Sequence, residues 1–463
     1  KKVPTRSKEK CDVVYVAIMR PGVFSLEQEP IVQGSLLSFN VTDGSINAMV
    51  GGYKYKSCAV ARLSGSGDAG CSEFNRAYQA KRQAGSTFKP VVYAAALDNG
   101  YTPTTIIVDA PIVYENEDEE SGGTWKPANY SKQFYGDTTF RDALIFSRNI
   151  PTTKILQDIR VSYVIDYARN LGITSDMPRD LSLGLGSTSV SLWEMTKVFG
   201  VFAAGGKKIS PFFIYKIEDR EGNIVEQYDP TKPYDPLMDK NFKEEDEKIQ
   251  EEQKKLIEDT EAESRRKQEQ EDVLKELEEE DEESIKQGIE GKKYVEDPVP
   301  NGYLISPKTA YIMNMLLKEA ATRGTGAQAG GAVNVPLAGK TGTSNDFTDA
   351  WFIGYTPEIV TGVWVGYDDQ SRSLGEGRTG ANVAIPIWIP YMKQAVSKTS
   401  KKDFDQPQGV KVVKVDGNSG RVASMRSKKI LYLPFKEGTE PTKVEGEYKP
   451  EDADDTKFFR ENY

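Results

Sequence analysis

The sequence contains no histidine, and this absence removes whole classes of chemistry. Its 463 residues include 60 Lys and Arg, 70 Asp and Glu, and 0 His. Ser-His-Asp catalysis, Cys-His catalysis and His-ligated metal sites are therefore excluded. A serine nucleophile in this chain would need a lysine or a carboxylate as its base.

Cysteine and long apolar runs are also scarce. Cys58 and Cys71, two of the three cysteines, flank a Gly/Ser-rich stretch. A loop disulfide in an oxidising compartment and a pair of free thiols both remain open. No apolar run approaches the roughly 18 residues that a membrane-spanning helix needs, and no signal peptide is visible. Because the chain opens on Lys1 rather than Met, we expect a fragment of a longer protein.

The charge is uneven along the chain. The formal net charge is -10, but residues 240–290 contain 21 acidic and 10 basic residues, a balance of -11. The remainder is therefore close to neutral, at +1. This distribution gives no indication of nucleic-acid binding, which requires a basic surface.

The strongest candidate nucleophile is Ser86, which forms a Ser-x-x-Lys pattern with Lys89. Residues i and i+3 share one face of a helix, so we expect Lys89 to reach the Ser86 hydroxyl, with Gly85 allowing a tight entry. The pattern alone arises by chance about once in 300 residues. A second copy runs from Ser7 to Lys10 in a charged segment. The surrounding motifs must therefore decide between the two.

A second element is the tripeptide Lys-Thr-Gly at Lys340, Thr341 and Gly342, followed by Thr343. It follows a strand-like run at 335–339, which predicts a sheet edge beside the nucleophile. Glycine there would let a substrate backbone approach closely. Lys340 supplies positive charge, and the two threonine hydroxyls are suited to hold a substrate carboxylate. The alternative interpretation is an ordinary Gly-Lys turn.

The third element is a Ser-x-Asn pattern at Ser147 and Asn149. Two other copies, starting at Ser38 and Ser45, lie in a predicted hairpin ahead of the candidate nucleophile. Ser147 instead ends a helical pattern and lies between Ser86 and Lys340 in sequence. We expect its hydroxyl to relay a proton from Lys89 to a leaving amine, and Asn149 to bind a substrate amide.

Hydrophobic residues make up 38% of the chain, enough for a large core, and the length favours more than one domain. Periodicity and turn residues predict the elements. Strands are expected at 13–18, 35–41, 46–50, 333–337, 350–355, 359–367 and 410–415, a hairpin at 211–226, and helices at 86–97, 141–171, 191–204 and 306–323. The acidic segment 237–295 has a heptad start at Phe242, Ile249 and Leu256 that then fails. It is either a helical hairpin or short coiled coil, or a solvated insertion.

Together the three elements resemble the motif set of the serine penicillin-recognising enzymes. Longer phrases resemble the class A penicillin-binding proteins, and their 1A branch in particular, over about residues 30–230 and 296–445. These phrases lie at 75–77, 82–90, 125–130, 147–151, 349–355 and 438–442. In that family a membrane anchor and a glycosyltransferase domain precede this portion. The acidic insertion is not a family motif.

The resemblance implies an α+β fold of the penicillin-binding transpeptidase and serine β-lactamase type. An antiparallel five-stranded sheet would carry helices on both faces, beside a helical subdomain with Ser147. The expected domains follow the order of the chain. They are a tail of an upstream or inserted non-catalytic domain at 1–33, the transpeptidase domain at 34–236 and 296–400, the insertion at 237–295, and a C-terminal extension at 401–463.

The resemblance also implies D-Ala-D-Ala transpeptidation without metal or cofactor. Ser86 would attack, a neutral Lys89 would take its proton, and the N–H groups of Ser86 and Thr343 would form the oxyanion hole. The expected partners are peptidoglycan stem peptides and β-lactams, with a protein partner at the insertion as a further interpretation. The expected location is the periplasmic face of the bacterial inner membrane.

Three alternatives stay open from the sequence. With water as the acceptor, the same site would make a D,D-carboxypeptidase or a β-lactamase. A non-catalytic sensor or scaffold would keep the pocket without turnover. The lifetime of a penicillin adduct separates these, since a long-lived adduct indicates a transpeptidase and rapid loss a β-lactamase.

Overall fold

The computed structural model describes most of the chain outside the acidic segment. The described residues are 2–4, 13–20, 23–27, 30–55, 72–115, 124–228, 289–290, 292–295 and 297–445. The cysteine pair, the second Ser-x-x-Lys copy and nearly all of segment 237–295 lie outside these residues. Within them, no helix combines the length and apolar character needed to cross a bilayer.

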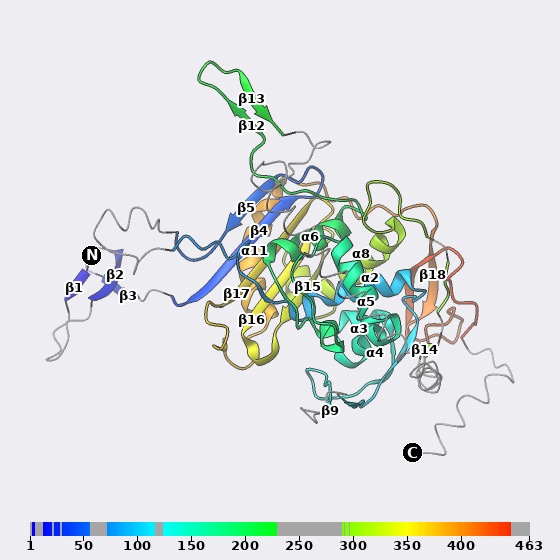
Figure 1. Cartoon of the computed structure of the whole chain (residues 1–463). Coiled ribbons are helices and arrows are strands. Elements are labelled where there is room, and N and C mark those ends of the chain that lie inside the picture. The colour runs from blue at the N-terminus through cyan, green and yellow to red at the C-terminus, as the bar shows by residue number, and fades with distance from the viewer. Residues whose placement is uncertain are drawn as a thin grey trace, which may run out of the picture.

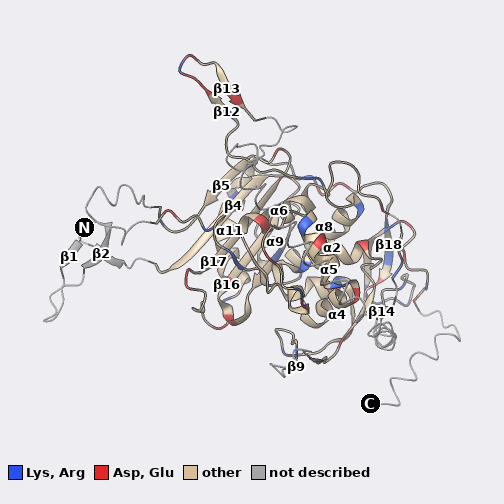
Figure 2. Ribbon diagram, viewed as in Figure 1, with Lys and Arg blue, Asp and Glu red and all other residues tan. Residues whose placement is uncertain are grey.

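An antiparallel five-stranded sheet forms the centre of the molecule (Figure 1). Its order is β15-β16-β17-β4-β5, so β15 is an edge strand. The strands are β4 (Val32–Asn40), β5 (Ile46–Val50), β15 (Ala338–Thr343), β16 (Asp349–Tyr355) and β17 (Ile359–Tyr367). β17 has no charged residue and β16 only Asp349 (Figure 2). Such strands need apolar cover on both faces.

Helices supply that cover, and alternate side chains of the sheet enter different halves of the core. On one face Tyr355 of β16 donates a hydrogen bond to Asn314 of α8 (Pro307–Thr322) at 2.7 Å. Helix α6 (Leu192–Ala203) packs on this face too. On the other face Phe352 meets Trp388 of α11 (Ile385–Ala395) edge to face, with ring centroids 5.1 Å apart.

A helical part lies beside the sheet and is built around α2 (Lys89–Asp98). All residues of α2 from Lys89 to Leu97 are buried, which explains its apolar sequence on every side. Three further helices, α3 (Phe140–Ile145), α4 (Asn149–Ile159) and α5 (Val161–Asn170), pack against it. The turn between α3 and α4 carries Ser147.

Smaller sheets surround these two parts. They are β1 (Lys2–Pro4), β2 (Val13–Arg20) and β3 (Val23–Glu27); β10 (Gly136–Thr139), β7 (Ile106–Asp109) and β14 (Ile289–Glu290); β6 (Arg82–Gln83) with β11 (Ser189–Val190); β8 (Tyr114–Glu115) with β9 (Thr124–Trp125); β12 (Lys216–Glu218) with β13 (Ile224–Gln227); and β18 (Val410–Asp416) with β19 (Ile430–Lys436). The β12–β13 hairpin projects from the body, whereas β18 lies beside the helical part (Figure 1).

Most predicted elements are confirmed, including the five-stranded sheet with helices on both faces. The strand expected at 333–337 is wrong, because β15 begins only at Ala338. Pro336 has no N–H to donate to a sheet, so the apolar run before the Lys-Thr-Gly motif does not pair with a neighbouring strand. The helix expected from Ser86 also begins later. Ser86 lies in a 3₁₀ turn, Gly85–Thr87, and α2 starts at Lys89, where Pro90 favours a helix start.

Candidate active site

The candidate nucleophile lies on a turn pressed against the edge strand β15. Gly85 has φ +53°, and a Cβ at this position would lie 2.5 Å from the backbone O of Thr343. Gly85 N–H donates to the O of Gly186 at 2.9 Å. Ser86 itself is half-buried, and the described part of the chain offers its hydroxyl no hydrogen-bond partner. The close approach therefore requires glycine and leaves the serine hydroxyl free.

Lys89 is fully buried at the start of α2 and turns toward the α3–α4 connection. Its Nζ donates to Asn149 Oδ1 at 2.7 Å and to Ser147 O at 2.8 Å. It also donates to Arg148 O at 3.1 Å and lies 3.4 Å from Ser147 Oγ. The contact that we expected with the Ser86 hydroxyl is not formed in this structure.

A second buried lysine, on the sheet, reaches the same hydroxyl. Lys340 Nζ donates to Ser147 Oγ at 3.0 Å and to Thr341 O at 3.1 Å. The Ser147 hydroxyl is thus placed between two amines, Lys89 on the helical part and Lys340 on the sheet. This arrangement connects all three sequence motifs through one oxygen atom.

Burial controls the charge of both lysines. Burial lowers the pKa of Lys89 well below its ordinary value, and the cations of Lys340 and Arg148 lower it further. Burial also lowers the pKa of Lys340, to about 7. The three hydrogen bonds that Lys89 Nζ donates are those of its charged form, but the lowered pKa values of both amines favour loss of a proton from one of this buried, like-charged pair. A neutral amine is the form that accepts a proton.

The backbone of Ser147 is in an unusual conformation. Its φ is +57°, in the left-handed region that residues other than glycine rarely occupy. The flanking turn is fixed because Ser147 N–H donates to Leu144 O and Arg148 N–H to Ala143 O. Strain of this kind persists only where surrounding structure holds it, and it clusters at functional sites.

Asn149 begins α4 and is held by a buried polar network. Its Nδ2 donates to Ala128 O at 2.7 Å, while its backbone N–H donates to Asn129 Oδ1 at 2.8 Å. Asn129 in turn donates to both carboxylate oxygens of Asp109 at 2.9 Å. Burial raises the pKa of the Asp109 carboxyl, while the Asn129 hydrogen bonds and nearby cations oppose that rise. The network ties the Ser147 turn to the loop at 125–130.

The edge strand β15 presents backbone and hydroxyl groups toward the nucleophile. Ser344 N–H donates to Asp349 O at 3.1 Å, and antiparallel pairs alternate, so the N–H and C=O of Thr343 face the free edge. The Thr343 hydroxyl accepts from Gly380 N–H at 3.2 Å, which leaves its O–H free to donate. The Thr341 hydroxyl instead donates to Thr325 Oγ1 at 2.6 Å. A Cβ at Gly342 would clash with Ala84 O at 2.7 Å.

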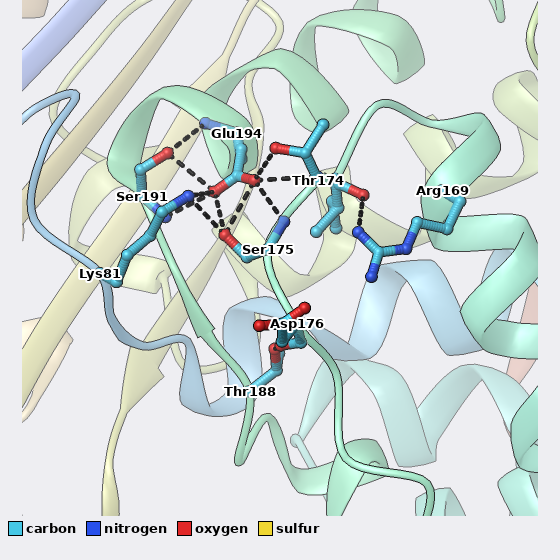
Figure 3. Close-up of polar contacts among 9 residues, drawn as sticks. Lys81, Arg169, Thr174, Ser175, Asp176, Thr188, Ser191 and Glu194 are labelled. Atoms are coloured by element: carbon cyan, nitrogen blue, oxygen red, sulfur yellow. Dashed lines mark hydrogen bonds and ion pairs between the residues drawn. The ribbon is translucent and has the colours of Figure 1, made fainter. Parts of the chain in front are cut away.

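A buried carboxylate holds the segment that leads into the nucleophile turn (Figure 3). Glu194 accepts from Lys81 Nζ at 2.9 Å and from the N–H groups of Thr174, Ser175 and Ser191 at 2.8–2.9 Å. The Ser191 and Glu194 pair also forms a capping box at the start of α6. Lys81 directly precedes β6, so this network fixes the strand that enters the Ser86 turn.

The structure brings together the residues that the sequence motifs singled out: Ser86, Lys89, Ser147, Asn149, Lys340, Thr341, Gly342 and Thr343. Sequence reasoning missed the residues that support them, which are Asn129, Asp109, Arg148, Thr325 and Glu194. Asn129 lies within a family-like phrase, but nothing in the phrase indicates its partners. The Ser191 and Glu194 pair carried a readable signal, since Ser-x-x-Glu before an apolar run marks a helix start.

Comparison with known proteins finds a matching family model and several relatives. Residues 34–386 match the family model of the penicillin binding protein transpeptidase domain. Penicillin-binding protein 1A of Pseudomonas aeruginosa is 35% identical over 436 residues, which cover 94% of this chain and 48% of that protein. Penicillin-binding protein 1A of Neisseria gonorrhoeae is 32% identical over 390 residues, covering 84% of this chain and 39% of that protein. The chain thus spans about half of these relatives, or less.

Solved structures share the fold. Penicillin-binding protein 1A from Haemophilus influenzae superposes with a TM-score of 0.71 at 25% identity, covering 94% of this chain and 57% of that one. The PonA1 protein of Mycobacterium tuberculosis, solved in complex with penicillin V, gives a TM-score of 0.55 at 20% identity over 82% of each chain. This second likeness concerns the fold alone.

Proposed function

The chain belongs to the penicillin-binding protein transpeptidase family, and we propose that it cross-links peptidoglycan stem peptides through an acyl-enzyme on Ser86. The observation that carries the proposal is the Ser147 hydroxyl, which lies within hydrogen-bond distance of the buried amines of Lys89 and Lys340, with Ser86 on the turn that leads into Lys89. We further propose that the domain works on the periplasmic side of the cytoplasmic membrane, where the substrate lies.

Acylation begins when Ser86 Oγ attacks the carbonyl carbon of the penultimate D-Ala. Lys89 lies three residues further, across the junction from the 3₁₀ turn to α2, and its neutral amine takes the proton. The oxyanion that develops is stabilised by the N–H groups of Ser86 and Thr343. Thr343 suits this role because its N–H faces the free edge of β15, against the nucleophile turn.

The leaving group then needs a proton. The proton on Lys89 passes to the terminal D-Ala amine through the Ser147 hydroxyl, which lies 3.4 Å from Lys89 Nζ. The C–N bond breaks, D-Ala leaves, and the acyl group stays on Ser86. An amine of a neighbouring stem peptide then attacks the ester and releases the cross-linked product, while Ser86 recovers its proton.

The terminal carboxylate of the substrate is held at β15. Lys340 provides the cation, and a bound carboxylate favours its charged form. The Thr343 hydroxyl donates to the carboxylate, because its oxygen already accepts from Gly380 and its hydrogen is free. Thr341 contributes less directly, since it donates to Thr325. Asn149 binds the substrate amide from the opposite wall of the site.

β-Lactams imitate the D-Ala-D-Ala amide, so they should acylate Ser86. Incubation with a fluorescent penicillin is expected to label the chain stoichiometrically, and peptide mapping should place the label on Ser86. Ser86→Ala should abolish labelling without lowering the melting temperature, because only a half-buried hydroxyl without hydrogen-bond partner is lost. Ser7→Ala, in the second Ser-x-x-Lys copy, is the matched control and should label normally.

The lifetime of the adduct decides between acceptors. Label that persists for minutes to hours is expected for a transpeptidase. Rapid loss of label would assign the site to a β-lactamase, and a chain that never labels would be a non-catalytic scaffold. Either result would contradict the proposal.

A further inference from the structure

A buried ion pair lies behind the two segments that carry the proposed oxyanion-hole donors. Arg82 Nε lies 2.6 Å from Asp349 Oδ1, and the two side chains are only 5% and 4% exposed. Arg82 precedes Ser86 by four residues, whereas Asp349 begins β16, the strand that pairs with β15. The chemistry proposed above assigns neither side chain a role.

Arg82 belongs to the segment that leads into the Ser86 turn. It pairs with Val190 in the short ladder of β6 and β11. Its guanidinium lies over the ring of Trp364, 5.0 Å from the ring centroid. Because only three residues separate Arg82 from Ser86, the position of this guanidinium restricts where the Ser86 N–H can lie.

Asp349 restricts the other donor through Ser344, the residue after Thr343. Asp349 N–H donates to Ser344 Oγ at 2.7 Å, and Ser344 N–H donates to Asp349 O at 3.1 Å. The carboxylate also accepts from Trp364 Nε1 at 2.8 Å, on the same Oδ1 that faces Arg82. The residue that fixes the end of β15 is therefore the one that Arg82 contacts.

The two segments approach each other closely in front of this pair. A Cβ at Gly85 would lie 2.5 Å from Thr343 O, and a Cβ at Gly342 would lie 2.7 Å from Ala84 O. An oxyanion hole works only when both donors lie within about 2.7–3.1 Å of the developing charge. A small shift of one segment against the other would therefore weaken it.

A contribution to stability does not account well for this pair. Arg82 Nη2 is buried and has no hydrogen-bond partner among the described residues, and Nη1 reaches only Asp368 O, at 3.4 Å. An unsatisfied buried donor is destabilising, and removing two charges from water often costs as much as their attraction returns. The pair does, however, hold two chain segments at a defined separation.

We propose that Arg82 and Asp349 are positioning residues that set the spacing between the Ser86 and Thr343 N–H groups, and so the strength of the oxyanion hole. When Ser86 Oγ bonds to the carbonyl carbon, the π electrons move to the carbonyl oxygen, and both N–H groups must already point at it. The inference rests on the proposed function, since it takes Ser86 as the nucleophile and these two groups as the donors.

Paired oxygen and sulfur ligands test the assignment. Sulfur is a weak hydrogen-bond acceptor, so a β-lactam with a thiocarbonyl in place of its carbonyl gains little from the hole. Stopped-flow acylation by a chromogenic cephalosporin and by its thiocarbonyl counterpart gives a non-covalent Kd and an acylation rate constant for each. We expect the parent to acylate with the oxygen ligand at least about a hundredfold faster.

Arg82→Met should lower the acylation rate constant for the oxygen ligand by about ten- to hundredfold and leave that for the sulfur ligand nearly unchanged. The Kd should stay within about twofold, because the hole acts in the transition state. The oxygen-to-sulfur rate ratio therefore falls. Asp349→Asn keeps the side-chain volume and an acceptor for Trp364, and it should lower the ratio too, by a smaller factor. It also provides the test if Arg82→Met does not fold.

Arg76→Met is the matched control. Arg76 is 6% exposed and pairs with Asp368, which directly follows β17. It thus joins the same stretch of chain to the same sheet, but it has no contact with Asp349 or Ser344 in the described structure. We expect Arg76→Met to lower the melting temperature and to keep the oxygen-to-sulfur ratio of the parent.

Three results would overturn the positioning role. One is an unchanged rate constant in both Arg82→Met and Asp349→Asn. Another is an equal loss with both ligands, which would place the effect on the attacking group. The third is the same fall of the ratio in Arg76→Met, which would make the effect one of general structure. Penicillin labelling of the parent reports on the proposed function separately, because a parent that never labels contradicts that function itself.

Discussion

Lys340 Nζ donates to the Ser147 hydroxyl at 3.0 Å, although the two residues lie 193 positions apart in sequence. The contact joins the edge strand of the sheet to the turn between α3 and α4. Because Lys89 approaches the same hydroxyl from α2, residues of all three motifs meet at this oxygen atom. Catalysis in this chain should therefore be sensitive to that single oxygen atom.

Two replacements of Ser147 distinguish the contribution of its hydroxyl to acylation from the contribution of its backbone conformation to stability. Both Ser147→Ala and Ser147→Gly remove the proposed relay, so each should slow penicillin acylation by about a hundredfold. Glycine relieves the left-handed φ of +57°, and we expect Ser147→Gly to be more stable than Ser147→Ala by about 0.5–1 kcal/mol. Stopped-flow acylation and urea unfolding measure the two effects. Normal acylation of either variant would remove Ser147 from the mechanism.

Burial of the Lys340 amine should lower the free energy of unfolding at neutral pH. Burial lowers its pKa from 10.5 to about 7, whereas the unfolded chain keeps the proton up to about 10.5. Between these values the unfolded state binds more protons, so parent stability rises with pH. Lys340→Met should be more stable than the parent by on the order of 1–3 kcal/mol at pH 7, and the difference should shrink toward pH 10.

The control for this prediction is the exposed Lys414→Met, which should follow the parent at every pH. Acylation by Lys340→Met should fall at the same time, because the substrate carboxylate loses its cation. A Lys340→Met chain that is less stable than the parent at pH 7 would show that burial of this amine is compensated in the fold.

Much of the fold could be predicted from local patterns. The strands 350–355 and 359–367 are long apolar β-rich runs, and the helix 191–204 has a serine cap and closing glycines, so each is specified by its own sequence. The strand predicted at 333–337 was wrong because Pro336 has no N–H to donate to a sheet, although the rest of the run is rich in β-forming residues. The helix predicted to begin at Ser86 begins instead at Lys89, because Pro90 favours a position in the first turn of a helix.

The site was predictable only as a set of motifs. Nothing local in the sequence indicates that Asn129 would join Asp109 to Asn149, because those contacts form between segments 20 residues apart. The left-handed backbone of Ser147 is likewise imposed by tertiary packing. Lys89 was expected at the Ser86 hydroxyl, but the carbonyls of the α3–α4 turn offer it more hydrogen bonds.

The Glu194 network should matter for stability (Figure 3). Burial alone would raise the pKa of its carboxyl, but hydrogen bonds from Ser191, Lys81 and Ser175 hold it well below its usual value. Glu194→Gln places an amide donor against those donors and should lower the unfolding free energy by about 2–4 kcal/mol at pH 7.

A carboxyl with a depressed pKa stabilises the fold above its unfolded pKa and loses that contribution as the pH falls. The difference between parent and Glu194→Gln should therefore be full at pH 7 and shrink below about pH 4.5. Glu226→Gln, at an exposed position on β13, is the control and should change stability little. A constant difference from pH 7 to 3 would contradict the assignment.

The C-terminal hairpin is attached through a buried lysine. Lys436 Nζ lies 2.7 Å from Asp98 at the end of α2 and 2.9 Å from Asp297. Lys436→Met removes a buried cation from both carboxylates, while Asp297 keeps its ion pair with Lys308 and Asp98 keeps the hydroxyl donors Tyr167 and Thr309. We expect a loss of about 2–4 kcal/mol by urea unfolding. Lys411→Met breaks the exposed pair with Glu437 on the same hairpin and should change the stability little. Equal costs would mean that burial does not determine the strength of this attachment.

The acidic insertion should be dispensable for acylation. Its negative charge would disfavour the approach of a substrate carboxylate, its apolar residues are sparse, and long surface insertions add little loop-closure cost. The described chain resumes at β14, where Ile289 pairs with Ile107, so a deletion of 240–286 with a short flexible linker keeps that pairing. We expect the second-order penicillin acylation rate and the melting temperature to match the parent.

If the rate falls more than about tenfold while the melting temperature is unchanged, the insertion shapes the active site. If both fall together, it contributes to the fold instead, and only an unchanged pair of values agrees with a role in spacing or partner binding outside the reaction.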